Sequence, residues 1–158
     1  MQEASQLLQE LRQRKPFPSL GQEAVVALLL TTELVRRAIG RTLEPHDITP
    51  QQYNVLRILR GAGDDGLPTL EIAGRMIEQT PGITRLLERI EGKGLVRRER
   101  CRQDRRQVLC WLTAAGLELV ERLDAPMDKA NTEAVAALEH EDQERLLRLL
   151  DAVRSRLR

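Results

Sequence analysis

The feature that most constrains the fold is a change of hydrophobic period within residues 83–112. Four apolar residues first follow the i, i+3, i+4, i+7 spacing of a helix with one buried face: Ile83, Leu86, Leu87 and Ile90. Gly92 and Gly94 then end the helical pattern, and two short strand-like runs follow at 95–100 and 108–112. A polar stretch separates the two runs. This order predicts a helix that leads directly into a β-hairpin with a charged tip.

The same segment concentrates positive charge. The whole chain of 158 residues has a formal net charge of only +1, but nine basic and four acidic residues lie between Arg85 and Arg106. Residues 117–158 instead hold ten acidic and seven basic residues. A compact basic segment in an otherwise balanced chain is typical of a nucleic-acid site.

Helix signals precede this segment. Thr49 as N-cap, Pro50 at the first helical position and Gln52 three residues after the cap predict a helix start, with Ile48 packing onto Tyr53. A glycine- and aspartate-rich loop at 61–66 ends that helix. Pro68 and Thr69 open a short third helix, whose expected apolar positions are Leu70, Ala73 and Met76 or Ile77. Thr80 and Pro81 open the basic helix, so the order is that of a winged helix-turn-helix.

Long apolar helices flank this core. The stretch from Ala24 to Leu43, capped by Ser19, is apolar over too broad an arc for a surface helix of a small domain, which predicts a second subunit. Two further helices are expected, at 113–124 with a possible continuation past Pro126, and at 139–157. The last has an apolar stripe of Leu146, Leu149, Leu150 and Val153. The predicted division is 1–45 for N-terminal dimerisation helices, 46–113 for the DNA-binding lobe and 114–158 for C-terminal dimerisation helices.

Three motifs in this order resemble the MarR family of bacterial transcriptional regulators. They are the helix start at 49–56, the segment 83–98, and Asp104-Arg105-Arg106 running into Leu112-Thr113-Ala114-Ala115-Gly116. The family's wing pattern D-x-R-x-x-x-V-x-L-T is met at Asp104, Arg106, Leu112 and Thr113, with Cys110 where valine is usual. The sequence departs from many relatives at Glu91-Gly92-Lys93-Gly94, where an extra glycine softens the helix end.

The resemblance implies a mainly α fold, a winged helix-turn-helix with a two-stranded β wing flanked by N- and C-terminal dimerisation helices. It also implies a homodimer that binds a pseudo-palindromic operator in double-stranded DNA and represses until a small ligand or an oxidant loosens it. Such a regulator has no catalytic site and needs no cofactor, and we expect this chain to act in the cytoplasm. Its longest apolar run, Ala24 to Leu30, is far shorter than the roughly 20 residues that span a bilayer, so no membrane partner is expected.

Residue roles follow from this hypothesis. An α-helix fits the major groove and arginines favour a narrow minor groove, while the helix N-terminus suits a phosphate. The expected DNA contacts are Thr80, Pro81, Gly82, Thr84, Arg85, Arg89, Arg98, Arg105 and Arg106. Asp104 is expected to position Arg106 in the wing through a charge-assisted hydrogen bond. His46, Tyr53 and Arg57 are candidate contacts for an aromatic or phenolic acid effector, although Tyr53 also fits a purely structural role in the core.

Alternatives remain open. Cys101 lies among arginines that favour its thiolate, so the chain could be an oxidant sensor, whereas Cys110 is expected to be a small core residue. Around a hairpin tip at Asp104, Cys110 would pair with Arg98 and Cys101 with Gln107, so the two thiols would not meet. A DNA-binding protein of low sequence preference is the other alternative. His46 and His140 lack a second ligand type at metal spacing, so no metal is expected, and the sequence holds no catalytic motif.

Overall fold

The computed structural model describes residues 6–78, 81–101 and 103–157. The contacts within the chain divide it into two units, 1–38 and 39–158, each described here by itself. The first unit contains α1 (Gln6–Glu10) and most of α2 (Leu20–Leu43). The predicted cap of α2 is present, because the backbone N–H of Gln22 donates to Oγ of Ser19 at 3.2 Å. The division into three functional parts stays a prediction.

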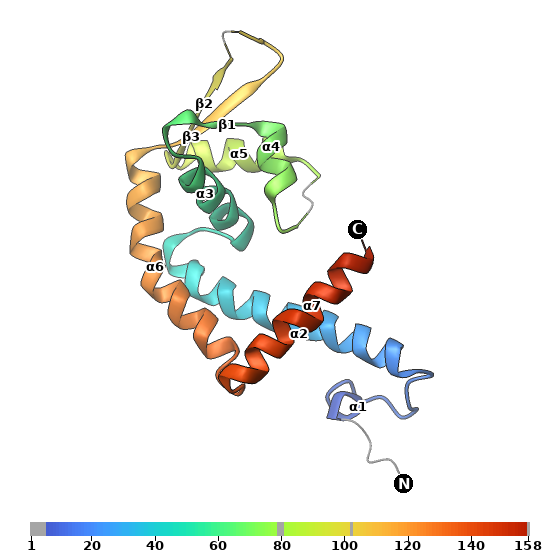
Figure 1. Ribbon diagram of the computed structural model, residues 1–158. Helices are drawn as coiled ribbons and strands as arrows, with labels where there is room; N and C mark the ends of the chain where they lie inside the picture. The colour runs from blue at the N-terminus through green and yellow to red at the C-terminus, as the bar shows by residue number, and fades with distance from the viewer. Residues whose placement is uncertain (1–5, 79–80, 102, 158) are drawn as a thin grey trace. The chain divides into compact units, whose positions relative to one another are not determined.

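The second unit holds the mixed α and β part of the chain (Figure 1). After the end of α2 its elements are η1 (Glu44–His46), α3 (Pro50–Ala62), η2 (Gly63–Asp65), β1 (Leu67–Pro68), α4 (Thr69–Arg75), α5 (Ile83–Gly92), β2 (Val96–Arg100), β3 (Val108–Leu112), α6 (Ala114–Ala134) and α7 (His140–Leu157). The predicted fold class, a mainly helical winged helix-turn-helix, is confirmed.

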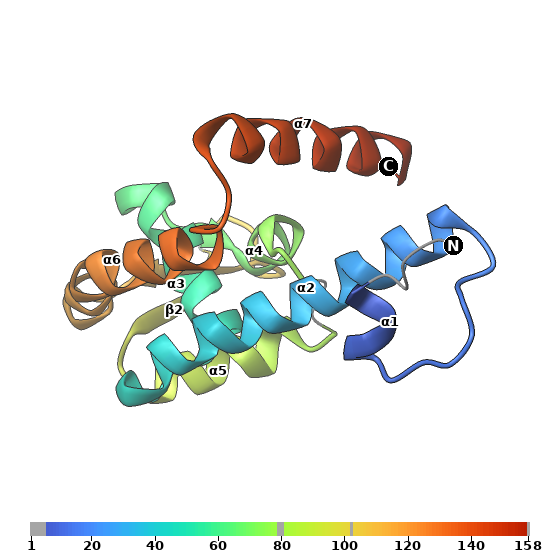
Figure 2. The same ribbon diagram turned by 90° about the horizontal axis from the view of Figure 1, so that it is seen from below.

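Helix α3 starts where its capping signals predict. Oγ1 of Thr49 accepts from the backbone N–H of Gln52 at 3.2 Å, and the Gln52 side chain accepts from the backbone N–H of Thr49 at 3.1 Å. These bonds satisfy two backbone donors that a helix start would otherwise leave open. Tyr53 and Ile48 are both buried in the core of this unit, and α3 lies beside α6 (Figure 2).

The apolar face predicted for α4 is partly wrong. Ile72 is fully buried, whereas Leu70 and Ile77 are 83% and 87% exposed. Successive residues of a helix are about 100° apart, so a helix that turns Ile72 into the core turns Leu70, two residues earlier, away from it. Met76, four residues after Ile72, is buried as predicted. Packing of α4 against α3, α5 and β3 buries the face with Ile72 and Met76.

The β-hairpin forms the larger part of a three-stranded antiparallel sheet in the order β1-β3-β2. Its strands match the two predicted runs, although β2 starts one residue later than expected, at Val96. Arg98 pairs with Cys110, as the predicted register requires, and the backbone N–H of Cys101 donates to the carbonyl of Gln107. The third strand, β1, pairs Leu67 with Cys110. At two residues, it is too short to leave a periodic signal in the sequence.

The hairpin joins α6 through a tight junction at Thr113. Its Oγ1 donates to the carbonyl of Gly94 at 2.7 Å and accepts from the backbone N–H of Gly116 at 3.0 Å, so one side chain caps α6 and ties it to the start of the hairpin. The Thr113 N–H donates to the carbonyl of Leu95. A Cβ on Gly116 would lie 2.1 Å from that same carbonyl oxygen, so only glycine allows the close approach.

Helix α6 continues through Pro126, as the sequence allowed, and ends at Ala134. Proline removes one backbone donor and crowds the preceding turn, so a helix that passes through it depends on side-chain packing for its stability. Leu119, Val120, Leu123 and Met127 provide that packing on the buried face of α6.

We predict that Gly116→Ala destabilises the protein by about 1–3 kcal/mol, because the added methyl group must push the Leu95 carbonyl aside. Gly61→Ala is the matched control, since Gly61 lies in α3 and a Cβ there would have nothing within 4 Å. Alanine at this position should stabilise the helix by roughly 0.5–1 kcal/mol. Denaturant unfolding measures both changes, and equal effects of the two substitutions would contradict the proposed packing.

Candidate nucleic-acid interface

Helix α5 has one buried and one exposed face. Leu86, Leu87 and Ile90 are buried in the core that α5 shares with α3 and α4. The opposite face is exposed and consists of Thr84, Arg85, Glu88 and Arg89. The residues predicted to meet bases are therefore accessible, while the apolar residues hold the helix on its scaffold.

The N-terminus of α5 differs from the predicted one. The helix begins at Ile83, whereas Pro81 and Gly82 form a turn before it, and Thr80 lies outside the described residues. Gly82 is the N-cap with a φ of +97°, a left-handed conformation that favours glycine. Because Gly82 has no side chain to accept a hydrogen bond, the first backbone N–H groups of α5 are uncapped at this position. Such a helix start suits an anion.

Asp104 organises the tip of the hairpin. Its Oδ1 accepts from the backbone N–H of Arg106 at 3.0 Å, and its Oδ2 accepts from the side-chain amide of Gln107 at 3.2 Å. The backbone N–H of Gln107 also donates to the Asp104 carbonyl. These bonds hold the backbone of the tip while the Arg105 and Arg106 side chains stay exposed. The hairpin extends beyond the helices that surround its base (Figure 1).

The predicted DNA contact Arg98 has protein partners. Its guanidinium lies 2.7 Å from Oε2 of Glu91 and 4.0 Å from Oε1 of Glu88, and its side chain is only 18% exposed. Glu88 of α5 thus approaches Arg98 of β2. The exposed face of α5 therefore borders the hairpin.

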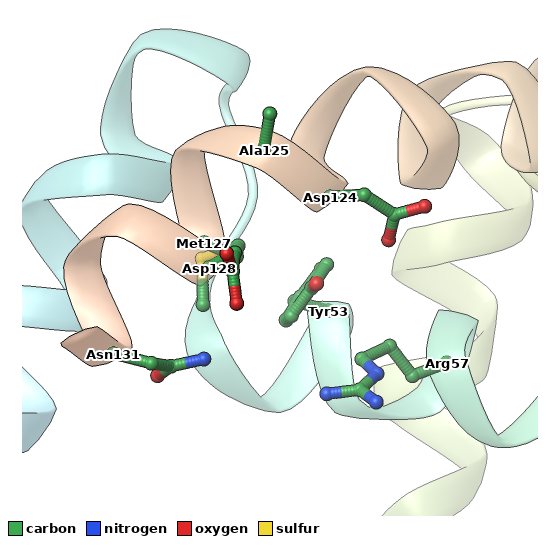
Figure 3. A pocket seen from close by; sticks show the side chains of 7 residues that line it. All are labelled: Tyr53, Arg57, Asp124, Ala125, Met127, Asp128 and Asn131. Carbon is green, nitrogen blue, oxygen red and sulfur yellow. The ribbon is translucent and has the colours of Figure 1, made fainter.

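A polar pocket of about 490 Å³ lies between α3 and α6 (Figure 3). Its lining residues are Tyr53, Arg57, Asp124, Ala125, Met127, Asp128 and Asn131. Two of the three predicted effector contacts, Tyr53 and Arg57, are thus brought together. His46 is exposed in η1 and is not one of the lining residues.

Four charged groups on or beside the wall set the electrostatics of this pocket. Arg60 donates from Nη1 to both carboxylate oxygens of Asp124, at 2.9 and 2.8 Å. This hydrogen bond holds the pKa of Asp124 below its ordinary value, so the carboxylate stays ionised and partnered. Burial raises the pKa of Tyr53, so its hydroxyl remains a donor at neutral pH. Arg57 and Asp128 place one positive and one negative charge on the pocket wall.

Comparison with known proteins identifies the family. The model of the MarR family matches residues 48–108. The transcriptional regulator HosA of Escherichia coli is 30% identical over 104 residues, which are 66% of this chain and 76% of HosA. The chain belongs to the MarR family.

Two further relatives agree. The HTH-type transcriptional regulator TtmR of Methylorubrum extorquens is 36% identical over 106 residues, 67% of this chain but only 53% of TtmR, so the match spans about half of that relative. The homoprotocatechuate degradative operon repressor of E. coli is 29% identical over 126 residues, 80% of this chain and 84% of the relative. These relatives confirm the prediction that this MarR-family chain is a transcriptional regulator and not an enzyme.

A solved structure agrees with the fold. The MepR–DNA complex of S. aureus superposes with a TM-score of 0.76 at 27% identity, covering 83% of this chain and 96% of MepR. The winged-helix architecture and the MarR resemblance predicted from the sequence are therefore confirmed.

Sequence reasoning missed the support for the hairpin in this MarR-family chain. The Arg97 guanidinium stacks 4.1 Å from the centre of the Trp111 ring, and the Trp111 indole N–H donates to the Asp64 carbonyl at 3.1 Å. Gly66, with a φ of +68°, leaves space for that ring, since a Cβ would lie 2.4 Å from it. The single tryptophan of the chain was the available signal, since a tryptophan N–H usually finds a partner.

The cysteines have different environments. Cys110 is fully buried beside Thr69, and burial raises the pKa of its thiol, so its predicted place in the core is confirmed. Cys101 is half-buried at the end of β2, and its reactivity stays a prediction.

The described part of the chain contains neither a cluster of metal ligands nor a membrane-spanning helix. Among residues 6–78, 81–101 and 103–157, no group of three or more His, Cys, Asp or Glu side chains is arranged to hold a metal ion. In the same residues, no helix has the length and apolar character needed to cross a membrane.

Proposed function

We propose that this MarR-family chain is a homodimeric, sequence-specific DNA-binding repressor that a small aromatic or phenolic acid releases from its operator. The observation that carries the DNA-binding part is the approach of Arg98 to Glu88, which places the polar face of α5 directly beside the arginine hairpin. One surface can then meet a major groove and an adjacent minor groove. The solved complex of MepR with DNA supports this assignment.

Different residues would make different contacts. Thr84, Arg85 and Arg89 would reach base edges from α5, and the turn at Pro81 and Gly82, with Thr80 before it, would approach a phosphate. Arg105 and Arg106 at the hairpin tip would enter the minor groove, where a narrow width strengthens the negative potential. Asp104 would hold the tip in the required conformation through its bond to the Arg106 backbone.

Apolar surface that the single chain leaves exposed supports the proposed dimer. In α7, Leu149 is 58% and Leu157 is 81% exposed, and none of the described residues of this helix is buried. In α2, Leu29 is 66% and Leu34 is 52% exposed. Aliphatic stripes of this length on two helices are typical of a homodimer interface, which must bury roughly 1,200–2,000 Å² or more.

The effector would occupy the pocket between α3 and α6. Arg57 could bind the carboxylate of an aromatic acid, and Asp128 and Asn131 could accept from its hydroxyl groups. Homoprotocatechuate, which gives one relative its name, is itself a phenolic acid. A ligand at this site weakens DNA binding only if it prefers a conformation in which the two recognition helices no longer fit the operator.

Arg106→Ala should strongly weaken binding to the operator without changing helicity. Arg85→Ala should relax the base preference at one position per half-site, at a cost of about 1–3 kcal/mol in binding free energy. Arg122→Ala in α6 is the control for loss of one positive charge elsewhere. A footprint on the DNA beside the chain's own gene supplies the operator, and fluorescence anisotropy at fixed salt measures affinity. Equal affinity of the wild type for operator and random DNA would instead indicate a low-specificity architectural protein.

Leu149→Glu should convert the dimer to monomer or insoluble protein, because it places a charge in the apolar stripe of α7. Leu147→Glu is the matched control, since Leu147 is 61% exposed and lies two residues from Leu149, a rotation of about 200° around the helix. Light scattering at micromolar concentration reports the mass of both. A wild-type chain that is monomeric and well folded under these conditions would rule out the dimer.

Arg57→Ala and Tyr53→Phe should raise the concentration of salicylate needed to release operator DNA, because they remove the cationic and hydroxyl groups of the pocket. His46→Ala should not, since His46 does not line the pocket. Titration of the preformed complex with salicylate measures the midpoint for each variant. Wild-type midpoints for both pocket variants would exclude this pocket as the effector site.

A further inference from the structure

The hairpin is attached to α5 at one point by both backbone and side chain. The backbone N–H of Arg98 donates to Oε1 of Glu91 at 3.1 Å, and its guanidinium Nε donates to Oε2 of the same carboxylate at 2.8 Å. A second guanidinium nitrogen lies 2.7 Å from Oε2. One carboxylate at the end of α5 thus binds one residue of β2 through both of its oxygens.

The position of Arg98 in the sheet explains why its backbone N–H is available. β2 is an edge strand, because the strand order is β1-β3-β2. Arg97 and Glu99, which flank Arg98, pair with Trp111 and Leu109 of β3, while Arg98 pairs with Cys110. In an antiparallel pair, alternate residues direct their backbone groups away from the neighbouring strand. Glu91 satisfies one of these outward donors, which would otherwise remain open at the sheet edge.

We propose that Glu91 and Arg98 are positioning residues that fix the angle of the hairpin relative to α5, and that Arg98 does not contact DNA. The inference rests on the proposed DNA-binding function. The chain between the two residues contains Gly92 and Gly94, the latter with a φ of +72°. Its backbone is tied to the end of α5, because the N–H groups of Gly94 and Leu95 donate to the carbonyls of Glu91 and Ile90. The Glu91–Arg98 link adds a second attachment, placed within β2 itself.

A small change of angle at Arg98 becomes large at the tip. β2 continues from Arg98 to Arg100, and the exposed residues Arg105 and Arg106 lie beyond its end. A tilt about Arg98 moves these residues by an amount that grows with their distance from Arg98. Arg105 and Arg106 would then no longer reach the minor groove of the DNA, even though their own side chains were unchanged.

The link also neutralises negative charge on α5. Glu91 and Glu88 are acidic groups on the helix that would face DNA, and Arg98 lies 2.7 and 4.0 Å from them. Its guanidinium therefore offsets two carboxylates that would repel phosphates. A group already engaged in this way, at 18% exposure, is a poor candidate for a phosphate contact of its own.

The decisive test compares two substitutions that change charge equally. Glu91→Gln and Glu99→Gln each remove one negative charge from the hairpin region, and Glu99 pairs only with its exposed neighbour Arg97 among the described residues. Electrostatics alone predicts that both variants bind DNA more tightly. We expect Glu99→Gln to bind at least as tightly as the wild type and Glu91→Gln to bind about tenfold more weakly, which corresponds to about 1.4 kcal/mol.

Arg98 variants separate positioning from direct contact. Arg98→Gln should also weaken binding about tenfold, but the slope of log K against log salt should stay that of the wild type, because no phosphate contact is lost. The double variant Glu91→Gln/Arg98→Gln should be no weaker than either single variant, since both remove the same link. In the free protein, hydrogen exchange at the Arg98 amide should accelerate in Glu91→Gln and not in Glu99→Gln.

The binding probe is a duplex selected by the wild type from a random-sequence pool, with an unselected duplex of equal length as the reference. Thermal unfolding of each variant confirms that it is folded at the assay temperature. A salt slope reduced by about one in Arg98→Gln, or unweakened binding by Glu91→Gln, would overturn the positioning role alone. Failure of the wild type to select any sequence would overturn the proposed function, and this inference with it.

Discussion

The candidate interface depends on the burial of one face of α5. A helix of ten residues is marginal in water, so Leu86, Leu87 and Ile90 must supply its stability by packing on α3 and α4. Each such side chain contributes roughly 1.5–3 kcal/mol when it leaves water. Because packing on one face stabilises the helix, the residues of the opposite face are not constrained by the core. Arg85 and Arg89 are exposed there without any structural task visible among the described residues.

Acidic side chains near a surface rich in arginine reduce its positive potential unless they pair with groups of the protein itself. All four acids between Arg85 and Arg106 have partners within the protein: Glu88 and Glu91 lie beside Arg98, Glu99 pairs with Arg97, and Asp104 binds the tip backbone. Their negative charge is therefore engaged within the protein. The positive charge of Arg105 and Arg106 remains exposed. The same arrangement explains how a chain with a net charge of only +1 can present a cationic surface.

Local signals were sufficient for much of this MarR-family fold. The capping box at Thr49 depends on residues three apart, the helix face at Ile83 to Ile90 depends on one period, and the hairpin register depends on the polar tip at Asp104. The charge cluster predicts a nucleic-acid site, and the three ordered motifs carry the resemblance to the MarR family. These features could be predicted because each depends on neighbours in the sequence.

Other features were decided only by the tertiary structure, because they depend on segments far apart in the chain. Ile72 is buried in place of Leu70 because α4 packs against α3, α5 and β3, which lie far apart from one another in the sequence. Gly116 is required because the Leu95 carbonyl lies where a Cβ would be. A count of charges predicts that Arg98 is available to DNA, but the fold brings Glu91 to both its backbone and its side chain. Composition and period thus determined which elements form and which surface is basic. Packing decided which of those basic groups bind the protein itself and which remain exposed.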